Sequence, residues 1–176
     1  MPLDDLLVPG SILPALKVNG KKQAVQELAA RAGAVTGLPE REVFDAVLQR
    51  ERLGSTGIGS GIAIPHCKLA KVTKLHGIFA RLEKPIDFDA LDGEPVDLIF
   101  LLVAPEAAGA DHLKALARMA RLLRDPAITA KLRATRDADG ICALLTQQPA
   151  AAKRPSSRPS PLPSGRGRIA VKRRSG

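Results

Sequence analysis

The residues best suited to chemistry lie in one 17-residue segment, 50–66, that ends in a histidine. It begins with Arg50, continues through a stretch rich in glycine and hydroxyl side chains, 54–61, and ends in Pro65 and His66. Backbone N–H groups of glycine-rich segments can approach an anion closely, and a neutral imidazole is a competent nucleophile near pH 7. The segment therefore predicts a site for a phosphoryl group, with His66 as the residue that reacts with it.

The same segment does not fit the common nucleotide-binding motifs. No lysine follows Gly61, as a Walker A loop requires, and the glycine spacing at 57–61 is not GxGxxG. Four glycines in eight residues, 54–61, are incompatible with a regular helix at reasonable cost. We therefore expect a shaped loop that does not bind a nucleotide.

Segment 50–66 resembles the signature of phosphotransferase-system IIA domains of the fructose/mannitol type, and most of all that of the nitrogen-regulatory IIA proteins. The similarity includes residues 94–98 and 111–116 and extends from the N-terminal region to about Gln148. It implies an α/β domain of three layers, with a mixed sheet between helices. It also implies a phosphotransferase activity in the form of a phosphohistidine phosphocarrier.

The resemblance assigns roles to individual residues. It implies that Nε2 of His66 accepts a phosphoryl group from a phosphohistidine on a small HPr-like protein upstream. His112 would support and orient the group, and the guanidinium of Arg50 would contact the phosphoryl oxygens. The hydroxyls and backbone N–H groups expected to hold the imidazole or the phosphoryl group are those of Thr56, Ser55, Gly57, Gly59 and Gly61. The scheme requires no metal and no other cofactor.

Some of these assignments have alternatives that the residues leave open. Arg50, Glu51 and Arg52 form a charge run that, as a pattern, is most often a solvated helix face. Arg52 could replace Arg50 if the helix ended differently. His112 could be a helix-cap histidine without chemistry, and His76 has no assigned role.

The elements around the segment follow from hydrophobic periodicity. Apolar spacing predicts helices over residues 22–36 and 39–53, before the glycines. Short apolar runs predict strands over residues 62–64, 75–82 and 96–103. The last of these has almost no polar face, which favours helices on both sides of the sheet.

Helical patterns return after Pro105. Asp111 is expected to cap a helix whose buried face includes Leu113, Leu116, Ala120 and Leu123. Further helices are expected over residues 126–134 and 137–147. The folded domain is therefore expected to span residues 1–148.

The charge of the chain is unevenly distributed. The 176 residues carry 27 Lys and Arg against 18 Asp and Glu, a net charge of +9. All the acidic residues and 19 of the basic ones precede Pro149, so the body is near +1 and residues 149–176 carry +8. This basic tail is rich in proline and serine and has few large aliphatic residues, so we expect it to be disordered.

Several features of the sequence indicate the cellular compartment. The longest strongly apolar run, 98–104, is far shorter than the roughly 20 residues of a membrane-spanning helix, so no membrane insertion is expected. The acidic N-terminus does not resemble a secretory signal. Cys67 and Cys142 lie 75 positions apart without CxxC spacing, which indicates neither a disulfide framework nor a zinc site. A cytoplasmic protein is the expectation.

Three functions are consistent with the sequence. The first is a regulatory phosphocarrier of a nitrogen-related phosphorelay, which binds regulatory target proteins according to the phosphorylation state of His66. The second is a transport component that passes the phosphoryl group to a IIB domain for fructose or mannitol. The third is a binding module whose basic tail contacts nucleic acid or an acidic protein; with four Phe and no Trp or Tyr, nucleic-acid binding outside the tail is not expected.

Overall fold

A computed structural model describes residues 3–146 of the chain. The expected boundary near Gln148 and the basic tail lie outside these residues. Within them the principal elements are β1 (Ile12–Leu16), α1 (Lys21–Thr36), α2 (Glu40–Glu51), β2 (Gly57–Gly59), β3 (Ile62–Ala63), β4 (His66–Leu69), β5 (His76–Ile86), β6 (Val96–Pro105), α3 (Asp111–Leu123), α4 (Pro126–Ala134) and α5 (Ala138–Thr146). Three short 3-10 turns complete the order, namely η1 (Leu3–Asp5), η2 (Pro9–Ser11) and η3 (Glu106–Ala108).

All six strands form one mixed sheet. The strand order is β1-β5-β6-β3-β2, and β4 also pairs with β6. β5 runs antiparallel to β6, whereas β3 and β4 both run parallel to it along the same edge. Ile62 is paired with Leu98, and His66 is paired with Leu102. The chain therefore pairs with β6 twice, first as β3 and then as β4, with an interruption at Pro65.

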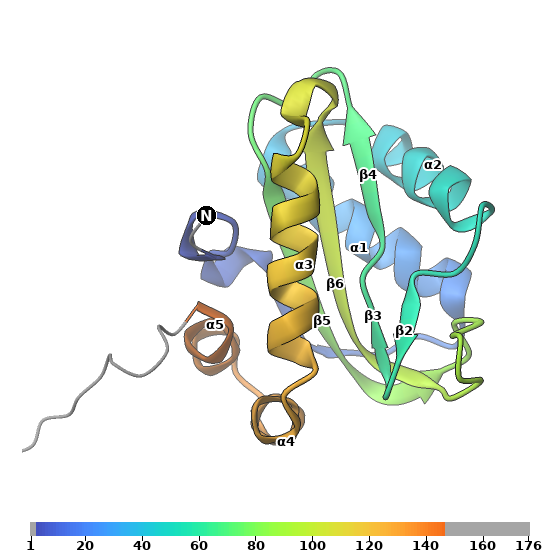
Figure 1. Cartoon of the computed structure of the whole chain (residues 1–176), viewed down its shortest axis with the longest axis vertical. Helices are drawn as coiled ribbons and strands as arrows, with labels where there is room; N and C mark the ends of the chain where they lie inside the picture. The colour runs from blue at the N-terminus through green and yellow to red at the C-terminus, as the bar shows by residue number, and fades with distance from the viewer. Residues whose placement is uncertain (1–2, 147–176) are drawn as a thin grey trace, which may run out of the picture. The chain divides into compact units, whose positions relative to one another are not determined.

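Helices cover both faces of the sheet (Figure 1). α1 and α2 pack on one face, around buried residues such as Leu28, Val47 and Ile99. α3, α4 and α5 pack on the other, around Phe100, Met119 and Leu132. The prediction of a three-layer α/β/α domain with a mixed sheet is confirmed, and the nearly all-apolar β6 is buried on both sides, as its composition required.

The predicted helices are present with ends close to those expected, because proline and glycine mark them. α1 ends at Gly37, whose φ of 81° is left-handed, and α4 begins at Pro126 behind a capping Asp125. α2 ends two residues earlier than predicted, at Glu51. None of the helices in residues 3–146 is long and apolar enough to cross a membrane.

Three expectations were wrong in detail. The glycine-rich stretch is not simply a loop: Gly57–Gly59 forms β2, which pairs antiparallel with β3 as a small hairpin. In α3 the N-cap is Ala110, not Asp111, and Leu113 is 60% exposed and so not part of the buried face. The buried side of α3 is instead formed by Ala115, Leu116, Met119 and Leu123.

Candidate functional site

His66 is the first residue of β4, a strand at the edge of the sheet that pairs with β6. Pro65 precedes it and its carbonyl accepts the N–H of Leu102, which anchors the start of β4 on β6. The side chain is half-buried in a hollow of about 350 Å³. The hollow is lined by Ala46, Gln49, Arg50, Leu53, His66, Cys67, Lys68 and His112.

The hydrogen bond of the His66 ring fixes its tautomer. Nδ1 lies 3.1 Å from the carbonyl oxygen of Ile64. A carbonyl oxygen can only accept, so Nδ1 carries the proton and donates it. In the neutral ring Nε2 therefore holds the free lone pair, and it is the nucleophilic atom.

Burial keeps His66 neutral. Desolvation lowers its pKa below 6.5, and the bond to Ile64 partly opposes this by favouring the protonated ring. The positive charge of Arg50 and the proximity of His112 lower the pKa further, while the carboxylate of Glu51 raises it. The net result is a ring that is mainly neutral at pH 7.

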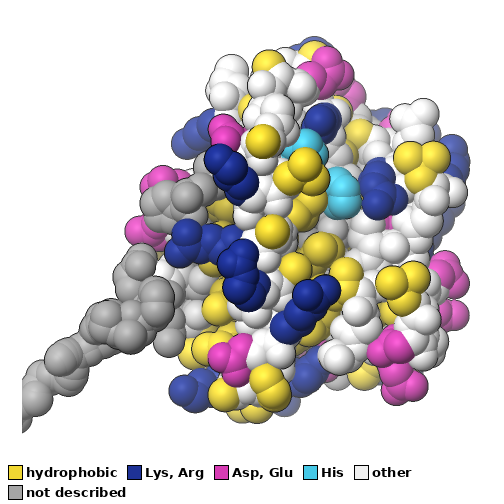
Figure 2. All heavy atoms as spheres, in the orientation of Figure 1, with side chains coloured by type: hydrophobic (Ala, Val, Ile, Leu, Met, Phe, Trp, Pro, Cys, Tyr) yellow, Lys and Arg dark blue, Asp and Glu magenta, His cyan; other side chains and the backbone are white. Residues whose placement is uncertain are grey.

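His112 lies across the hollow from the β4 edge, in the first turn of α3. Its Nδ1 donates to the carbonyl of Gly109 at 2.7 Å, so its Nε2 is the nitrogen available to a ligand. The histidine is thus held at the positive end of the helix dipole, a favourable place for an anion. Figure 2 shows two histidine side chains close together at the surface, with hydrophobic side chains and a basic side chain beside them.

Arg50 is in the last turn of α2. Its Nη1 donates to the carbonyl of Gly54 at 3.0 Å, which folds the guanidinium back over the turn that follows the helix. Arg52 is exposed and does not line the hollow, so the structure favours Arg50 over its competitor. Arg50, His66 and His112 are brought together as the sequence predicted.

The hydroxyl residues of the segment lie behind this group. Thr56 is buried, and both its N–H and its hydroxyl donate to the carboxylate of Glu51. The hydroxyl of Ser55 donates to the carbonyl of Phe88 at 2.7 Å and accepts the N–H of Gly57. Neither side chain lines the hollow around His66.

The glycines also serve the hairpin more than the hollow. A Cβ on Gly57 would lie 2.8 Å from that of Ala90, so close packing requires glycine there. Gly61 has a φ of 82°, and a Cβ on it would lie 2.6 Å from Nη2 of Arg133. Gly59 faces Asp92. None of the three lines the hollow.

Two features of the candidate site were not predicted from the sequence. Glu51, expected on a solvated helix face, is only 8% exposed and is at the centre of a polar network. Leu53 and Leu113 are exposed apolar residues beside the site, 84% and 60% accessible. The acidic residue next to Arg50 was visible in the sequence, but nothing in a run of charges indicates which one is turned inward.

The fold and the site together define a class: three-layer α/β domains that present a neutral histidine at a sheet edge beside a second histidine and an arginine. The model of the family described as "Phosphoenolpyruvate-dependent sugar phosphotransferase system, EIIA 2" matches residues 5–148. The chain belongs to this family, whose members are phosphocarriers.

Relatives within the family narrow the assignment. The nitrogen regulatory protein of Bradyrhizobium diazoefficiens is 64% identical over 152 residues, which cover 86% of this chain and 99% of that protein. The nitrogen regulatory protein of Escherichia coli is 43% identical over 129 residues, covering 73% and 79%. The crystal structure of nitrogen regulatory protein IIA-Ntr from Neisseria meningitidis superposes with a TM-score of 0.79 at 36% identity, covering 82% of this chain and 99% of that one. Within the family the chain is therefore similar to IIA proteins of the nitrogen-regulatory type.

Proposed function

We propose that this protein is a regulatory phosphocarrier that accepts a phosphoryl group on Nε2 of His66 from a phosphohistidine of an HPr-like protein. The observation that carries the proposal is the hydrogen bond from Nδ1 of His66 to Ile64, which leaves Nε2 as the free nucleophilic nitrogen. The depressed pKa of the ring supports it, because only the neutral ring can attack.

The transfer proceeds between two imidazoles. The lone pair on Nε2 of His66 attacks the phosphorus, a new P–N bond forms there, and the P–N bond to the donor histidine breaks with its electron pair returning to the donor nitrogen. Nδ1 of His66 keeps its proton, which it donates to the Ile64 carbonyl. The phosphorylated ring is therefore cationic and offsets part of the phosphoryl charge. The group can be passed on by the reverse of the same step.

Arg50 and His112 stabilise the phosphoryl oxygens in this scheme. The guanidinium supplies a planar fork of N–H donors to the equatorial oxygens, whose charge is spread in the transition state. The nitrogen of His112 available to the phosphoryl group is Nε2, because Nδ1–H is held by the carbonyl of Gly109. In this proposal the hairpin behind the site is shaped by Thr56, Ser55, Gly57, Gly59 and Gly61.

The regulatory role rests on similarity to nitrogen regulatory proteins. We infer that the free and phosphorylated forms bind regulatory target proteins differently, and that the protein acts in the cytoplasm. Transport is the competing function, because IIA proteins of this family also work with IIB partners. Efficient and selective donation from this protein to a fructose or mannitol IIB domain would favour transport over regulation.

The test of the phosphorylation site is mass spectrometry after incubation with the upstream phosphorelay proteins. Wild-type protein is expected to gain one phosphoryl group, mapped to the peptide that contains His66. The His66→Ala variant is expected to gain none, while His112→Ala still accepts the group, but slowly. Phosphorylation that persists in His66→Ala would refute the assignment.

A further inference from the structure

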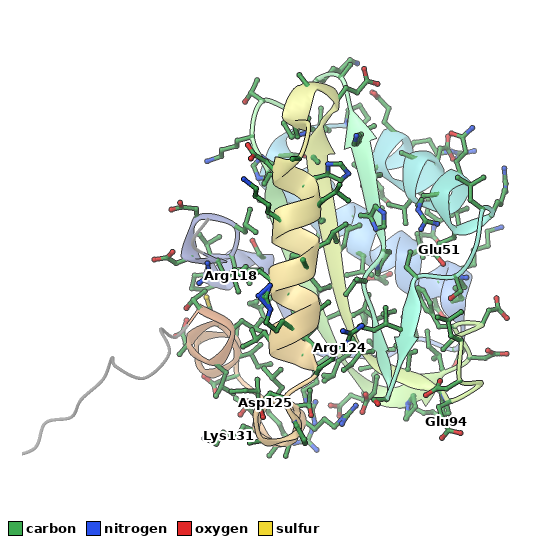
Figure 3. The ribbon with its side chains drawn as sticks, in the orientation of Figure 1. Glu51, Glu94, Arg118, Arg124, Asp125 and Lys131 are labelled. Carbon is green, nitrogen blue, oxygen red and sulfur yellow. The ribbon has the colours of Figure 1, made fainter. Side chains whose placement is uncertain are left out.

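A buried carboxylate lies behind the site, and the transfer scheme above does not use it. Glu51 is the last residue of α2 and the neighbour of Arg50, yet its side chain is only 3% exposed. Burying a carboxylate is costly unless it is paired and hydrogen-bonded. Glu51, labelled in Figure 3, therefore needs partners, and the structure provides them from two other segments.

The partners of Glu51 come from the start of α1 and the start of the β2-β3 hairpin. Nζ of Lys21 lies 2.9 Å from Oε1. The N–H of Thr56 donates to Oε1 at 3.3 Å, and the Thr56 hydroxyl donates to Oε2. Lys21 is itself held 4.7 Å above the centre of the Phe88 ring and 3.5 Å from Asp89. One carboxylate thus ties together α1, α2 and the hairpin.

The same carboxylate closes the turn on which Arg50 rests. Residues 52–55 form a turn that connects Glu51 to Thr56. The turn is joined to Glu51 covalently at its first end, and at its second end through the hydrogen bonds of Thr56 to the Glu51 carboxylate. Within the turn the N–H of Leu53 donates to the main-chain carbonyl of Arg50, and that of Gly54 donates to the main-chain carbonyl of Glu51, each at 3.1 Å. The Gly54 carbonyl then accepts Nη1 of Arg50 at 3.0 Å. The place of the guanidinium therefore depends on a turn that Glu51 holds shut.

We propose that Glu51 is a positioning residue for phosphoryl transfer: through Thr56 it fixes the turn 52–55, and through that turn the Arg50 guanidinium beside His66, with Lys21 neutralising the buried carboxylate. This proposal rests on the proposed function. It gives the buried Thr56 hydroxyl an indirect role, since that hydroxyl bonds Glu51 and so helps to fix the turn that holds Arg50. It also places a negative charge among the groups that act on His66, which are otherwise Arg50 and His112.

The test compares steady-state transfer from a phosphorylated HPr-like donor to the full-length wild type and four variants. Glu51→Ala is expected to lower kcat by about 10- to 100-fold with KM for the donor changed less than about threefold, because a misplaced guanidinium weakens the transition state more than docking. Glu51→Gln is expected to stay within about fivefold of wild type, since an amide can still accept the Thr56 N–H and bond its hydroxyl. Thr56→Val, which removes one of the two bonds, should fall between them.

Asp89→Asn is the matched control. Asp89 is the other carboxylate on Lys21, but its side chain is 74% exposed and it has no bond to Thr56 or the turn. This variant is expected to transfer at the wild-type rate. Rescue by Gln and the insensitivity of Asp89→Asn separate positioning from a general loss of charge around Lys21.

A second readout does not depend on transfer. In an NMR titration of Glu51→Gln the His66 pKa should fall, because the carboxylate that favours the protonated ring is lost. The Arg50 Nε–H signal should broaden in Glu51→Ala as the guanidinium loses its fixed place. Both spectra also report whether each variant is folded, and if Glu51→Ala does not fold, Glu51→Gln and Thr56→Val carry the test.

The proposal is overturned if folded Glu51→Ala transfers within twofold of Asp89→Asn, or if its loss of rate equals its loss of folded protein. Failure of the underlying function has a different signature, because the wild type itself would then gain no phosphoryl group on His66. The two failures are therefore distinguishable in one set of measurements.

Discussion

In the proposed transfer, the pKa of His66 decides over which pH range the protein can accept a phosphoryl group. Burial and the charge of Arg50 disfavour the imidazolium, so the ring stays neutral to a lower pH than an exposed histidine, whose pKa is near 6.5. Protonation removes the Nε2 lone pair. The rate of acceptance is therefore expected to fall as the pH is lowered, with a midpoint below pH 6.5 that coincides with the His66 pKa measured by NMR. A rate that already halves near pH 7, with no change in the donor, would contradict this.

Arg50 has two effects that different substitutions separate. Arg50→Gln removes the charge and the fork, so kcat should fall by about 10²- to 10³-fold and the His66 pKa should rise. Arg50→Lys keeps the charge but loses the planar pair of donors, so kcat should still fall by about tenfold or more. The His66 pKa of Arg50→Lys should stay near that of wild type. Rates from single-turnover transfer and midpoints from NMR check both effects.

At this scale the sequence predicts the residues that line the hollow better than those behind them. His66, Arg50 and His112 were predicted through the 50–66 and 111–116 patterns, and the structure brings them to one hollow. Glu51 was missed because burial of a charge depends on partners from distant segments, here Lys21 and Thr56. Hydrophobic periodicity contains no information about such partners.

At the scale of elements, the exposed end of α3 is expected to be part of the docking face for the phosphoryl donor. Leu113 follows His112 and is 60% exposed, so an apolar contact is available next to the site. Leu113→Asp should raise KM for the donor by about three- to tenfold, corresponding to roughly 1 kcal/mol of lost apolar contact, with little change in thermal stability.

The matched control for that prediction is Leu91→Asp. Leu91 is 83% exposed and lies in the segment between β5 and β6, outside the hollow. The same change of charge at this position should leave KM unaltered. An equal rise in KM for both variants would point to net charge rather than to the α3 contact.

The glycines of the β2-β3 hairpin offer a second prediction at this scale. Gly61→Ala places a Cβ at positive φ and against Arg133 and Asp97, so the free energy of unfolding should fall by about 1–3 kcal/mol. Because Gly61 does not line the hollow, kcat per folded molecule should change less than about twofold. Urea denaturation and transfer kinetics on the same preparation check both; a large loss of kcat without loss of stability would restore Gly61 to the phosphoryl-binding set.

Long elements with apolar or periodic sequences were easier to predict than short strands. β6 and the helices were predicted because long apolar or periodic runs leave few alternatives. β1, β2 and β4 were not predicted, since they are three to five residues long, and β2 is two-thirds glycine. Such strands exist because β5, β6 and β3 offer them partners, which only the tertiary fold provides.

At the scale of the whole molecule, the excess charge and the proposed chemistry belong to different parts of the chain. The sequence before Pro149 is near +1, and its basic residues include several in described ion pairs, such as Arg133 with Asp97 and Arg81 with Glu83. The proposed phosphoryl site uses a few charges at one hollow. A long-range electrostatic attraction to polyanions would therefore have to come from residues 149–176, which carry +8.

This separation predicts the behaviour of a chain shortened to residues 1–148. The truncated protein should accept the phosphoryl group within about twofold of the full chain, because every residue proposed to act in transfer lies between Lys21 and His112. Any affinity of the full chain for DNA or RNA should be lost with the tail, together with the steep salt dependence that eight neutralised phosphates would produce. Fluorescence anisotropy over a range of salt concentrations, alongside transfer kinetics, measures both. Equal binding by the two chains would place the contact on the domain instead, and slower transfer by the truncated chain would mean that the basic segment takes part in recruiting the donor.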